Sequence, residues 1–177
     1  GFPIHRGVLA CARKGAPLSI ESLLSAETVL VLNGISNHDN VGAAFRNAAA
    51  FGVGGILLDE TSCDPLYRKS IRVSAGSALW MPYSHAGTGA DHLEALRAAG
   101  FDIWAMTPQA SATSLHKMKP KKKTAILLGA EGPGLPAELI DACTAVRIPM
   151  SPEFDSINVA TAGAVALSHI FSVQTEA

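Results

Sequence analysis

The sequence predicts an α/β protein with a mainly parallel sheet and helices on both faces. Short buried-type runs, such as TVLVL at 28–32 and TAILL at 124–128, alternate with helical segments. Aromatic residues are only 6% of the chain, so small side chains dominate, as in tightly packed helix-on-sheet layers. The 177 residues suffice for one core that needs neither disulfides nor a structural metal.

The first part of the chain reads as an arm followed by a βαβ unit. We expect residues 1–26 to be a linker or N-terminal arm with a short helix at 19–25, and residues 27–177 to form the domain. The apolar run 28–32 predicts a buried strand. A small-residue helix over 40–51, ended by Gly52, and a second strand at 55–58 complete the unit.

The middle of the chain continues the alternation. Residues 65–75 predict a basic helix, and residues 91–99 predict a helix that Gly100 ends. The next strand is expected at 101–106, where apolar side chains return.

The last part repeats the pattern. We expect strands at 124–128 and 145–148, separated by a helix at 136–142 that begins with a proline. A long final helix over about 158–172 covers the sheet. Because parallel sheets bind ligands at the carboxyl ends of their strands, the loops after these strands are where a site is expected.

Charge, cysteine and histidine content exclude several classes of function. The formal net charge of -1 gives no global attraction to nucleic acid, so a polyanionic partner needs a local basic patch. Cys11, Cys63 and Cys143 are odd in number and far apart, which predicts free thiols in a cytoplasmic protein. The six histidines show no ligand spacing, so no metal is expected. The longest weakly polar run, 159–171, is too short to span a bilayer, so no membrane is expected.

The segment 33–48 after the first strand carries the first unusual residues. Asp39 or Asn40 suits the N-cap of the following helix, and Gly42 permits close approach of another backbone. Arg46 falls on an Ala-rich, buried-looking helix, where a guanidinium needs an anionic partner or a water-filled cleft. Phosphate recognition and a structural ion pair explain it equally well.

The segment 129–135, GAEGPGL, follows the strand at 124–128. It matches neither the dinucleotide fingerprint nor the P-loop, which disfavours nicotinamide and nucleoside triphosphate sites. Its glycines expose backbone groups, and Glu131 could accept hydrogen bonds from a cationic or hydroxyl-bearing ligand. For the loop alone, a plain Gly/Pro turn between strand and helix is the commoner explanation.

The segment 148–162 follows the last strand. Ser156 could simply cap the final helix. Asn158 is harder to explain in this way, because a half-buried amide among Val, Ala and Thr requires hydrogen-bond partners.

Together the three segments resemble a known family. N-x-G-x-x-x-R at 40–46, L-G-A-E-G-P-G-L at 128–135, and I-P-M followed by S-I-N-V-A-T-A up to 162 are similar to the motifs of the SpoU (TrmH-type) branch of the SPOUT RNA methyltransferases. The resemblance spans about residues 29–171. It implies a C-terminal deep trefoil knot, S-adenosylmethionine (SAM) as cofactor, a homodimer, and methyl transfer to a ribose 2′-OH of tRNA or rRNA.

The same resemblance implies roles for individual residues. Arg46, which could serve the partner's cofactor, would clamp a phosphate, Asn40 would hold the substrate side, and Ser156 and Asn158 would orient the ribose or relay its proton. Glu131 would fix the loop and also belong to the cofactor pocket. Ile157 stands where the family more often has Leu. The implied cofactor residues are Thr107, Gly129, Glu131, Ile148, Met150 and Ile157.

RNA contacts are expected on two basic segments. The implied RNA-binding residues, which resemble the basic R-x-S-x-G region of the family, are Arg46, Arg68, Lys69, Arg72 and Ser74. The lysine run at 117–123 is a second candidate, although a solvated loop is the commoner explanation for such a run. His5, Arg6 and Gly7 resemble the family's connection to an N-terminal RNA-binding domain, so the arm is expected to be the remnant of such a connection.

Two functions remain open. The enzyme is favoured because Arg46, Glu131, Ser156 and Asn158 are all present. The alternative is a catalytically inactive SAM-binding or RNA-binding module that acts in RNA assembly or regulation. A Rossmann dinucleotide enzyme is discarded, because both the glycine fingerprint and the acidic residue that follows it are missing.

Overall fold

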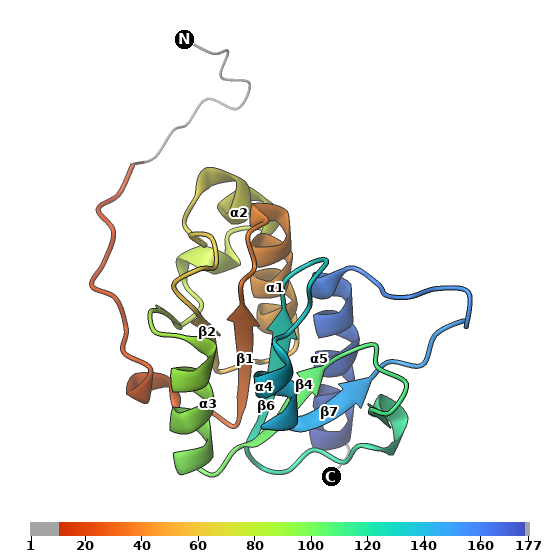
Figure 1. The fold of residues 1–177 in the computed structure, drawn as a ribbon. Helices are drawn as coiled ribbons and strands as arrows, with labels where there is room; N and C mark the ends of the chain where they lie inside the picture. Colours follow the sequence, from red (N-terminus) through yellow and green to blue (C-terminus); the bar gives the residue numbers. More distant parts are fainter. Residues whose placement is uncertain (1–10, 176–177) are drawn as a thin grey trace.

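A computed structural model describes residues 11–175, which contain one seven-stranded sheet of order β3-β2-β1-β6-β4-β7-β5 (Figure 1). All its strand pairs are parallel. The strands are β1 (Thr28–Asn33), β2 (Gly55–Leu58), β3 (Tyr83–His85), β4 (Asp102–Met106), β5 (Thr113–Ser114), β6 (Thr124–Gly129) and β7 (Thr144–Arg147). The predicted fold class, a mainly parallel α/β sheet, is confirmed.

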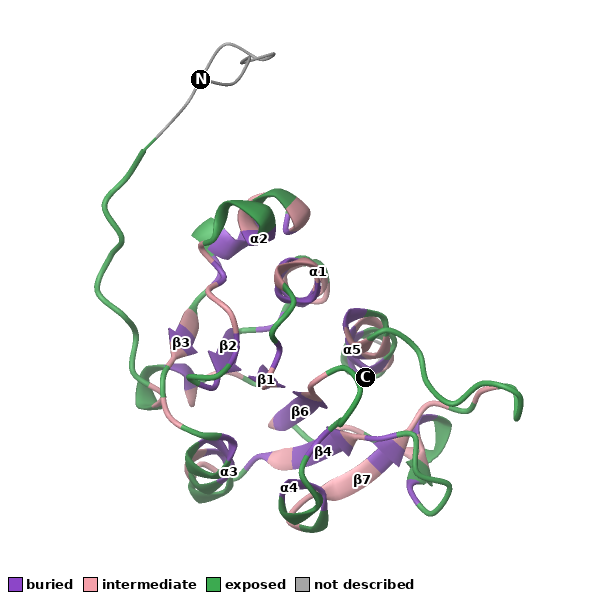
Figure 2. Ribbon diagram, turned by 45° about the horizontal axis from the view of Figure 1, so that its top comes forward, coloured by how far each residue is buried: buried purple, intermediate pink, exposed green. Residues whose placement is uncertain are grey.

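Helices cover both faces of the sheet (Figure 2). The α-helices are α1 (His38–Ala50), α2 (Arg68–Val73), α3 (Gly89–Ala98), α4 (Ala137–Asp141) and α5 (Val159–Thr175). Three 3-10 turns, η1 (Glu21–Leu23), η2 (Ser77–Leu79) and η3 (Leu115–Lys117), complete the described structure. Figure 2 shows α1, α2 and α5 along one face and α3 and α4 along the other.

Each face of the sheet has its own apolar core. The side chains of alternate strand positions point to opposite faces, so Leu30 and Ile126 join the cluster under α1 and α5. Val31 and Leu127 join the cluster under α3 and α4. Continuous burial of the central strands is the pattern of a sheet covered on both sides.

The chain changes its direction across the sheet between β1 and β6. The strands β2 and β3 lie outward from β1 on one side, whereas β4, β7 and β5 lie outward from β6 on the other. In parallel sheets, such a switch point opens a crevice at the carboxyl ends of the strands. The helix α1, which follows β1, and the glycine-rich loop, which follows β6, therefore meet at this edge.

Most expected elements are present with small shifts of their ends, but some details were wrong. Asn37, and neither Asp39 nor Asn40, caps α1: its side chain accepts from the backbone N of Asp39 over 2.9 Å. The basic helix is shorter than the expected range of 65–75. It covers only α2, Arg68–Val73, because the chain turns at Ser74. The short strands β3 and β5 were not predicted, since two or three residues give no readable periodicity.

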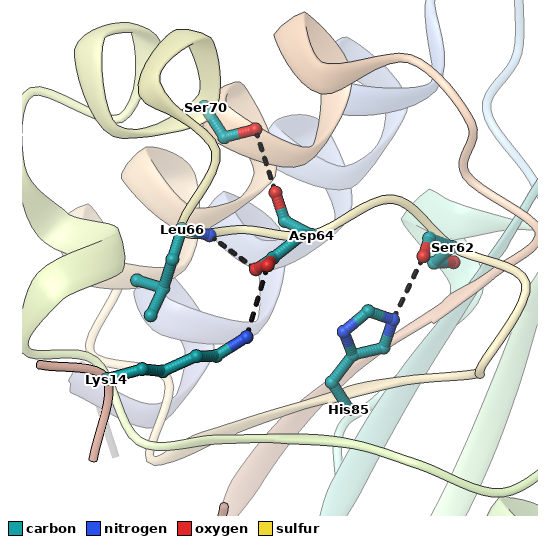
Figure 3. A network of polar contacts seen from close by, with 6 residues as sticks. All are labelled: Lys14, Ser62, Asp64, Leu66, Ser70 and His85. Atoms are coloured by element: carbon teal, nitrogen blue, oxygen red, sulfur yellow. Dashed lines mark hydrogen bonds and ion pairs between the residues drawn. The ribbon is translucent and has the colours of Figure 1, made fainter.

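Within residues 11–26, Leu23 is buried in the core, and Lys14 forms an exposed ion pair with Asp64 (Figure 3). The Nζ of Lys14 lies 3.1 Å from Oδ2 of Asp64, while Oδ1 of the same carboxylate accepts from the backbone N of Leu66 over 2.9 Å. Nearby, Nε2 of His85 donates to the carbonyl oxygen of Ser62 over 2.9 Å. Burial raises the pKa of Asp64, but the hydrogen bonds from Leu66 and Lys14 and the charge of Lys14 outweigh burial and leave the pKa lowered. An ion pair this exposed adds little stability.

Candidate cofactor pocket and RNA-facing surface

A pocket of about 530 Å³ opens at the carboxyl edge of the sheet. Its walls come from the loops after β4, β6 and β7 and from the start of α5. All six residues of the implied cofactor site line it: Thr107, Gly129, Glu131, Ile148, Met150 and Ile157. Ser156 and Asn158 line it as well. Three segments that are far apart in the sequence therefore form one concave site.

Sequence reasoning missed most of the apolar wall. The pocket is also lined by Met106, Leu128, Leu135, Ile140, Val159 and Ala162, among others. Leu128, Leu135, Val159 and Ala162 lie within the expected motifs, whereas Met106 and Ile140 lie outside them and are marked only by their nearness to strand ends. Their sequence positions cannot show which of them turn toward the cavity.

The glycine-rich loop closes tightly on itself at Gly129. A Cβ built on Gly129 would lie 2.5 Å from the backbone N of Leu135 and 2.6 Å from the carbonyl carbon of Gly134. Gly132 and Gly134 have positive φ angles of 87° and 73°, which favour glycine. The loop is thus more than a plain connection, because its backbone forms one wall of the pocket.

Asn158 connects the three motifs. Its Nδ2 donates to Oδ1 of Asn40 over 2.9 Å and to Oε1 of Glu131 over 3.1 Å. Its Oδ1 accepts from the backbone N of Ala160 over 3.0 Å and of Thr161 over 3.2 Å, so Asn158, not Ser156, caps α5. The partners expected for this amide are therefore present.

Asn40 and Arg46 occupy different environments on α1. Asn40 is buried, and its Nδ2 has no hydrogen-bond partner among the described residues, which leaves one donor free at the edge of the site. Arg46 is exposed, contrary to the buried position expected from its alanine-rich neighbours. Within residues 11–175, no carboxylate pairs with its guanidinium. The structural ion pair considered for Arg46 is therefore not seen in this part of the chain.

The segment of α2 is held directly against α1. A Cβ on Gly42 would lie 2.7 Å from the carbonyl oxygen of Ser70 and 2.8 Å from Cβ of Val73, as expected for a glycine at a close approach. The Ser70 hydroxyl donates to the carbonyl oxygen of His38 over 3.2 Å. This contact places the basic helix beside the helix that carries Asn40 and Arg46.

The expected RNA-binding residues separate into two groups. Arg68, Lys69 and Arg72 are exposed on α2, and Lys69 pairs with Asp39 over 2.8 Å. Ser74 is buried, and its hydroxyl donates to the carbonyl oxygen of Ile71 over 2.9 Å. This burial disfavours a direct contact between Ser74 and RNA. Its hydroxyl shapes the turn that follows α2.

The end of the lysine run lies before β6, at the amino ends of the strands, whereas the pocket lies at their carboxyl ends. Lys123 directly precedes β6, and its Nζ donates to the carbonyl oxygens of Leu24 and Ala99 over 3.0 and 3.1 Å. Lys121 lies 3.6 Å from Asp102. These contacts favour a structural and solvated loop over an RNA surface.

The described residues also bear on the expectations about metal ions and membranes. Within residues 11–175, no cluster of three or more His, Cys, Asp or Glu side chains could hold a metal ion. No helix in that range combines the length and the apolar character needed to cross a bilayer. His5, Arg6 and Gly7 lie outside the described residues.

The fold and the pocket define a class: parallel α/β proteins that bind a ligand in a crevice at the carboxyl edge of the sheet. The chain belongs to the SpoU rRNA Methylase family, whose family model matches residues 27–168. This match confirms the resemblance that the three motifs indicated.

Individual relatives agree with this membership. An uncharacterized tRNA/rRNA methyltransferase of Mycobacterium bovis is 43% identical over 94% of this chain and 59% of its own. The 23S rRNA (guanosine-2′-O-)-methyltransferase RlmB of Bordetella pertussis is 30% identical over 92% of this chain and 69% of its own. The crystal structure of an AdoMet-bound rRNA methyltransferase from Sinorhizobium meliloti has a TM-score of 0.80 and 28% identity, covering 89% of this chain and 60% of that one. The chain thus spans about three fifths of the length of the Mycobacterium relative.

Proposed function

We propose that this chain is the catalytic domain of a SAM-dependent RNA methyltransferase that methylates a ribose 2′-OH of tRNA or rRNA. The observation that carries the proposal is the charge of the pocket. Glu131 is the one charged side chain among the described residues that line it. A wall without Lys or Arg does not suit a phosphate-bearing nucleotide, whereas a carboxylate suits a sulfonium cation.

The shape of the pocket also fits this cofactor. Its volume of about 530 Å³ lies in the range of small-molecule sites, which are mostly apolar with a few polar groups. Leu135, Ile140 and Ile148 offer apolar surface for a purine. The tightly closed glycine-rich loop at Gly129 brings backbone groups to the cavity. The AdoMet-bound Sinorhizobium relative supports the assignment.

The reaction forms a bond between the ribose oxygen and the methyl carbon, breaks the bond between that carbon and sulfur, and removes the hydroxyl proton. Bound SAM supplies a methyl group activated by its positive sulfur. The protein must position the hydroxyl and assist loss of its proton. Arg46, whose guanidinium is too weak a base to take the proton, clamps the neighbouring phosphate and lowers the hydroxyl pKa.

The remaining polar residues hold the nucleophile in place. Ser156 and Asn158, which line the pocket, orient the ribose or relay its proton. Asn40, whose Nδ2 has no hydrogen-bond partner among the described residues, holds the substrate side. Glu131 keeps the glycine-rich loop in register through its hydrogen bond from Asn158. Ile157 fills the adenine pocket in place of the more usual Leu.

The proposal includes the knot and a dimer. The chain returns from β7, beyond β4, to place α5 on α1, and Nε2 of His169 on α5 donates to the carbonyl oxygen of Met118 in the connection before β6. Threading of this return through that connection would form the trefoil knot.

Three apolar side chains of α5, Val165, Phe171 and Val173, are exposed and support contact with a second copy. A cytoplasmic location and a role of residues 1–26 as a connecting arm are part of the same proposal.

The test combines cofactor binding with product analysis. We expect titration calorimetry to show one SAM per chain, with much weaker binding to Glu131→Gln, which removes the charge and keeps the side-chain size. Methyl transfer from radiolabelled SAM to total tRNA and rRNA, followed by nucleoside analysis, should yield 2′-O-methylated ribose. SAM binding without methyl transfer to any RNA would favour the inactive module. A folded dimer that binds no SAM would contradict the enzyme and would favour the RNA-binding module.

A further inference from the structure

Leu79 and Trp80 are unusually exposed for apolar side chains, since each keeps 65% of its surface accessible. They end the turn η2, whose other residues, Ser77 and Ala78, are buried. The next residue, Met81, is also buried. The buried side chains of the turn therefore pack in the core, while Leu79 and Trp80 remain at the surface.

Hydrogen bonds make this turn rigid. The backbone N atoms of Trp80 and Met81 both donate to the carbonyl oxygen of Ser77, over 3.1 and 2.9 Å. The Ser77 hydroxyl donates to the carbonyl oxygen of Ser74 over 3.0 Å, and the Ser74 hydroxyl accepts from the backbone N of Ala78 over 3.3 Å. The indole of Trp80 is thus presented by a fixed backbone, which lowers the entropy cost of binding to it.

The turn directly follows the basic helix. Arg68, Lys69 and Arg72 are exposed on α2, and within residues 11–175 only Lys69 has a carboxylate partner. Tyr67, at the start of α2, is 44% exposed, and its ring centroid lies 4.4 Å from that of His38. Cations interleaved with exposed aromatic rings are typical of surfaces that bind single-stranded nucleic acid.

We propose that Trp80 is a stacking platform for an unpaired base of the RNA substrate, with Arg68 and Arg72 holding the adjoining phosphates. This inference rests on the proposed function, because α2 and η2 pack on α1, which carries Asn40 and Arg46. A strand bound over α2 would lie next to the helix of the site. The neighbouring positive charge favours RNA over an apolar protein partner.

The two tryptophans of the chain allow a direct test. Trp104 is fully buried, so a base that stacks on the surface quenches only the fluorescence of Trp80. We expect a short single-stranded oligouridylate to quench part of the wild-type emission. The Trp80→Phe variant, which retains only Trp104, should show no quenching, although its RNA affinity stays close to wild type because the aromatic ring is kept.

Affinity measured by fluorescence anisotropy separates stacking from charge. Trp80→Ala should weaken binding of labelled oligouridylate by about 5- to 100-fold with an unchanged salt slope. Arg72→Ala should lower that slope by about one. Leu79→Ala, the matched exposed apolar control, should change the affinity less than about twofold.

The inference is overturned if the wild type binds oligouridylate without quenching, or if Trp80→Ala binds it as tightly as wild type. It is also overturned if Trp80→Ala changes only the oligomeric mass in light scattering, which would assign the surface to a protein contact. SAM titration and methyl-transfer assays of the same variants separate this inference from the proposed function. If Trp80→Ala binds SAM, transfers methyl groups and binds RNA as the wild type does, the inference about Trp80 fails while the proposed enzymatic function stands.

Discussion

The amide of Asn158 donates a hydrogen bond to Oδ1 of Asn40 over 2.9 Å, although 118 positions separate the two residues in the chain. The same Nδ2 reaches Glu131, and the Oδ1 of Asn158 caps α5. One side chain thus joins the helix after β1, the loop after β6 and the start of α5. Its removal affects both the site and the helix.

Two substitutions at Asn158 should separate these effects. Asn158→Ala loses the cap and should lower the free energy of unfolding by about 1 kcal/mol. Asn158→Asp keeps a capping oxygen but turns a carboxylate toward the oxygens of Asn40 and Glu131. We expect it to keep most of the stability and to lose at least about tenfold in methyl transfer. Wild-type transfer by Asn158→Asp would contradict the role of this contact.

Gly129 should tolerate no side chain. The Cβ of Gly129→Ala would meet the backbone of Gly134 and Leu135 at 2.5 to 2.8 Å, so the loop must shift and the pocket wall with it. We expect weaker SAM binding in calorimetry and a lower melting temperature. Gly15→Ala is the matched control, because nothing lies within 4 Å of its Cβ. Equal SAM affinity and equal melting temperature of the two variants would argue against tight backbone packing at Gly129.

Asp59 should make stability depend on acid pH. Burial alone would raise its pKa, but hydrogen bonds from Ser62, Thr61 and the backbone N of Gly34 lower the pKa below its usual value. A depressed folded pKa adds stability above the unfolded value of about 3.9, and this stability is lost as the pH falls through the folded pKa.

The Asp59→Asn variant tests this linkage. It should be less stable at neutral pH by about 1–3 kcal/mol, because its amide cannot accept all of these hydrogen bonds. Between about pH 5 and the folded pKa, its stability should fall less steeply than that of the wild type. Denaturant unfolding at several pH values measures both quantities, and parallel pH profiles would contradict the role of the carboxylate.

Arg46 should matter for activity and not for stability. Its side chain is exposed, so Arg46→Ala should change the melting temperature little. We expect methyl transfer to be lost in Arg46→Ala and retained in trace in Arg46→Lys, which keeps a charge but not the bidentate geometry. Equal loss in both variants would count against a simple charge role for this residue.

Two adjacent lysines should behave differently. Lys123 donates two hydrogen bonds to carbonyl oxygens and lies 5.2 Å from the ring centroid of Phe101. Lys123→Met should therefore lower the free energy of unfolding by about 1–2 kcal/mol. Lys122 lies 4.0 Å from Glu27, with both side chains exposed, so Lys122→Met should have no measurable effect. Neither change should alter oligouridylate affinity, which the same anisotropy assay can check.

Much of the fold could be predicted because its central strands are continuous apolar runs. The strands β1, β2 and β6 are buried on both faces, so their composition alone distinguishes them. The edge strands β3 and β5 pair with one neighbour each. Their hydrogen bonds depend on that neighbour, which local sequence does not reveal.

The sequence by itself determined the layered parallel fold and, through three motifs, pointed to the polar residues of the pocket and to part of its apolar wall. Only the tertiary structure decided which motif residues meet, that Asn37 and Asn158 are the caps, and that Ser74 is buried while Arg46 is exposed. It also placed Lys123 at the amino ends of the strands, away from the site, and left Trp80 at the surface. The physical reason is that burial and hydrogen-bond partners are properties of packed elements, whereas composition and periodicity are local.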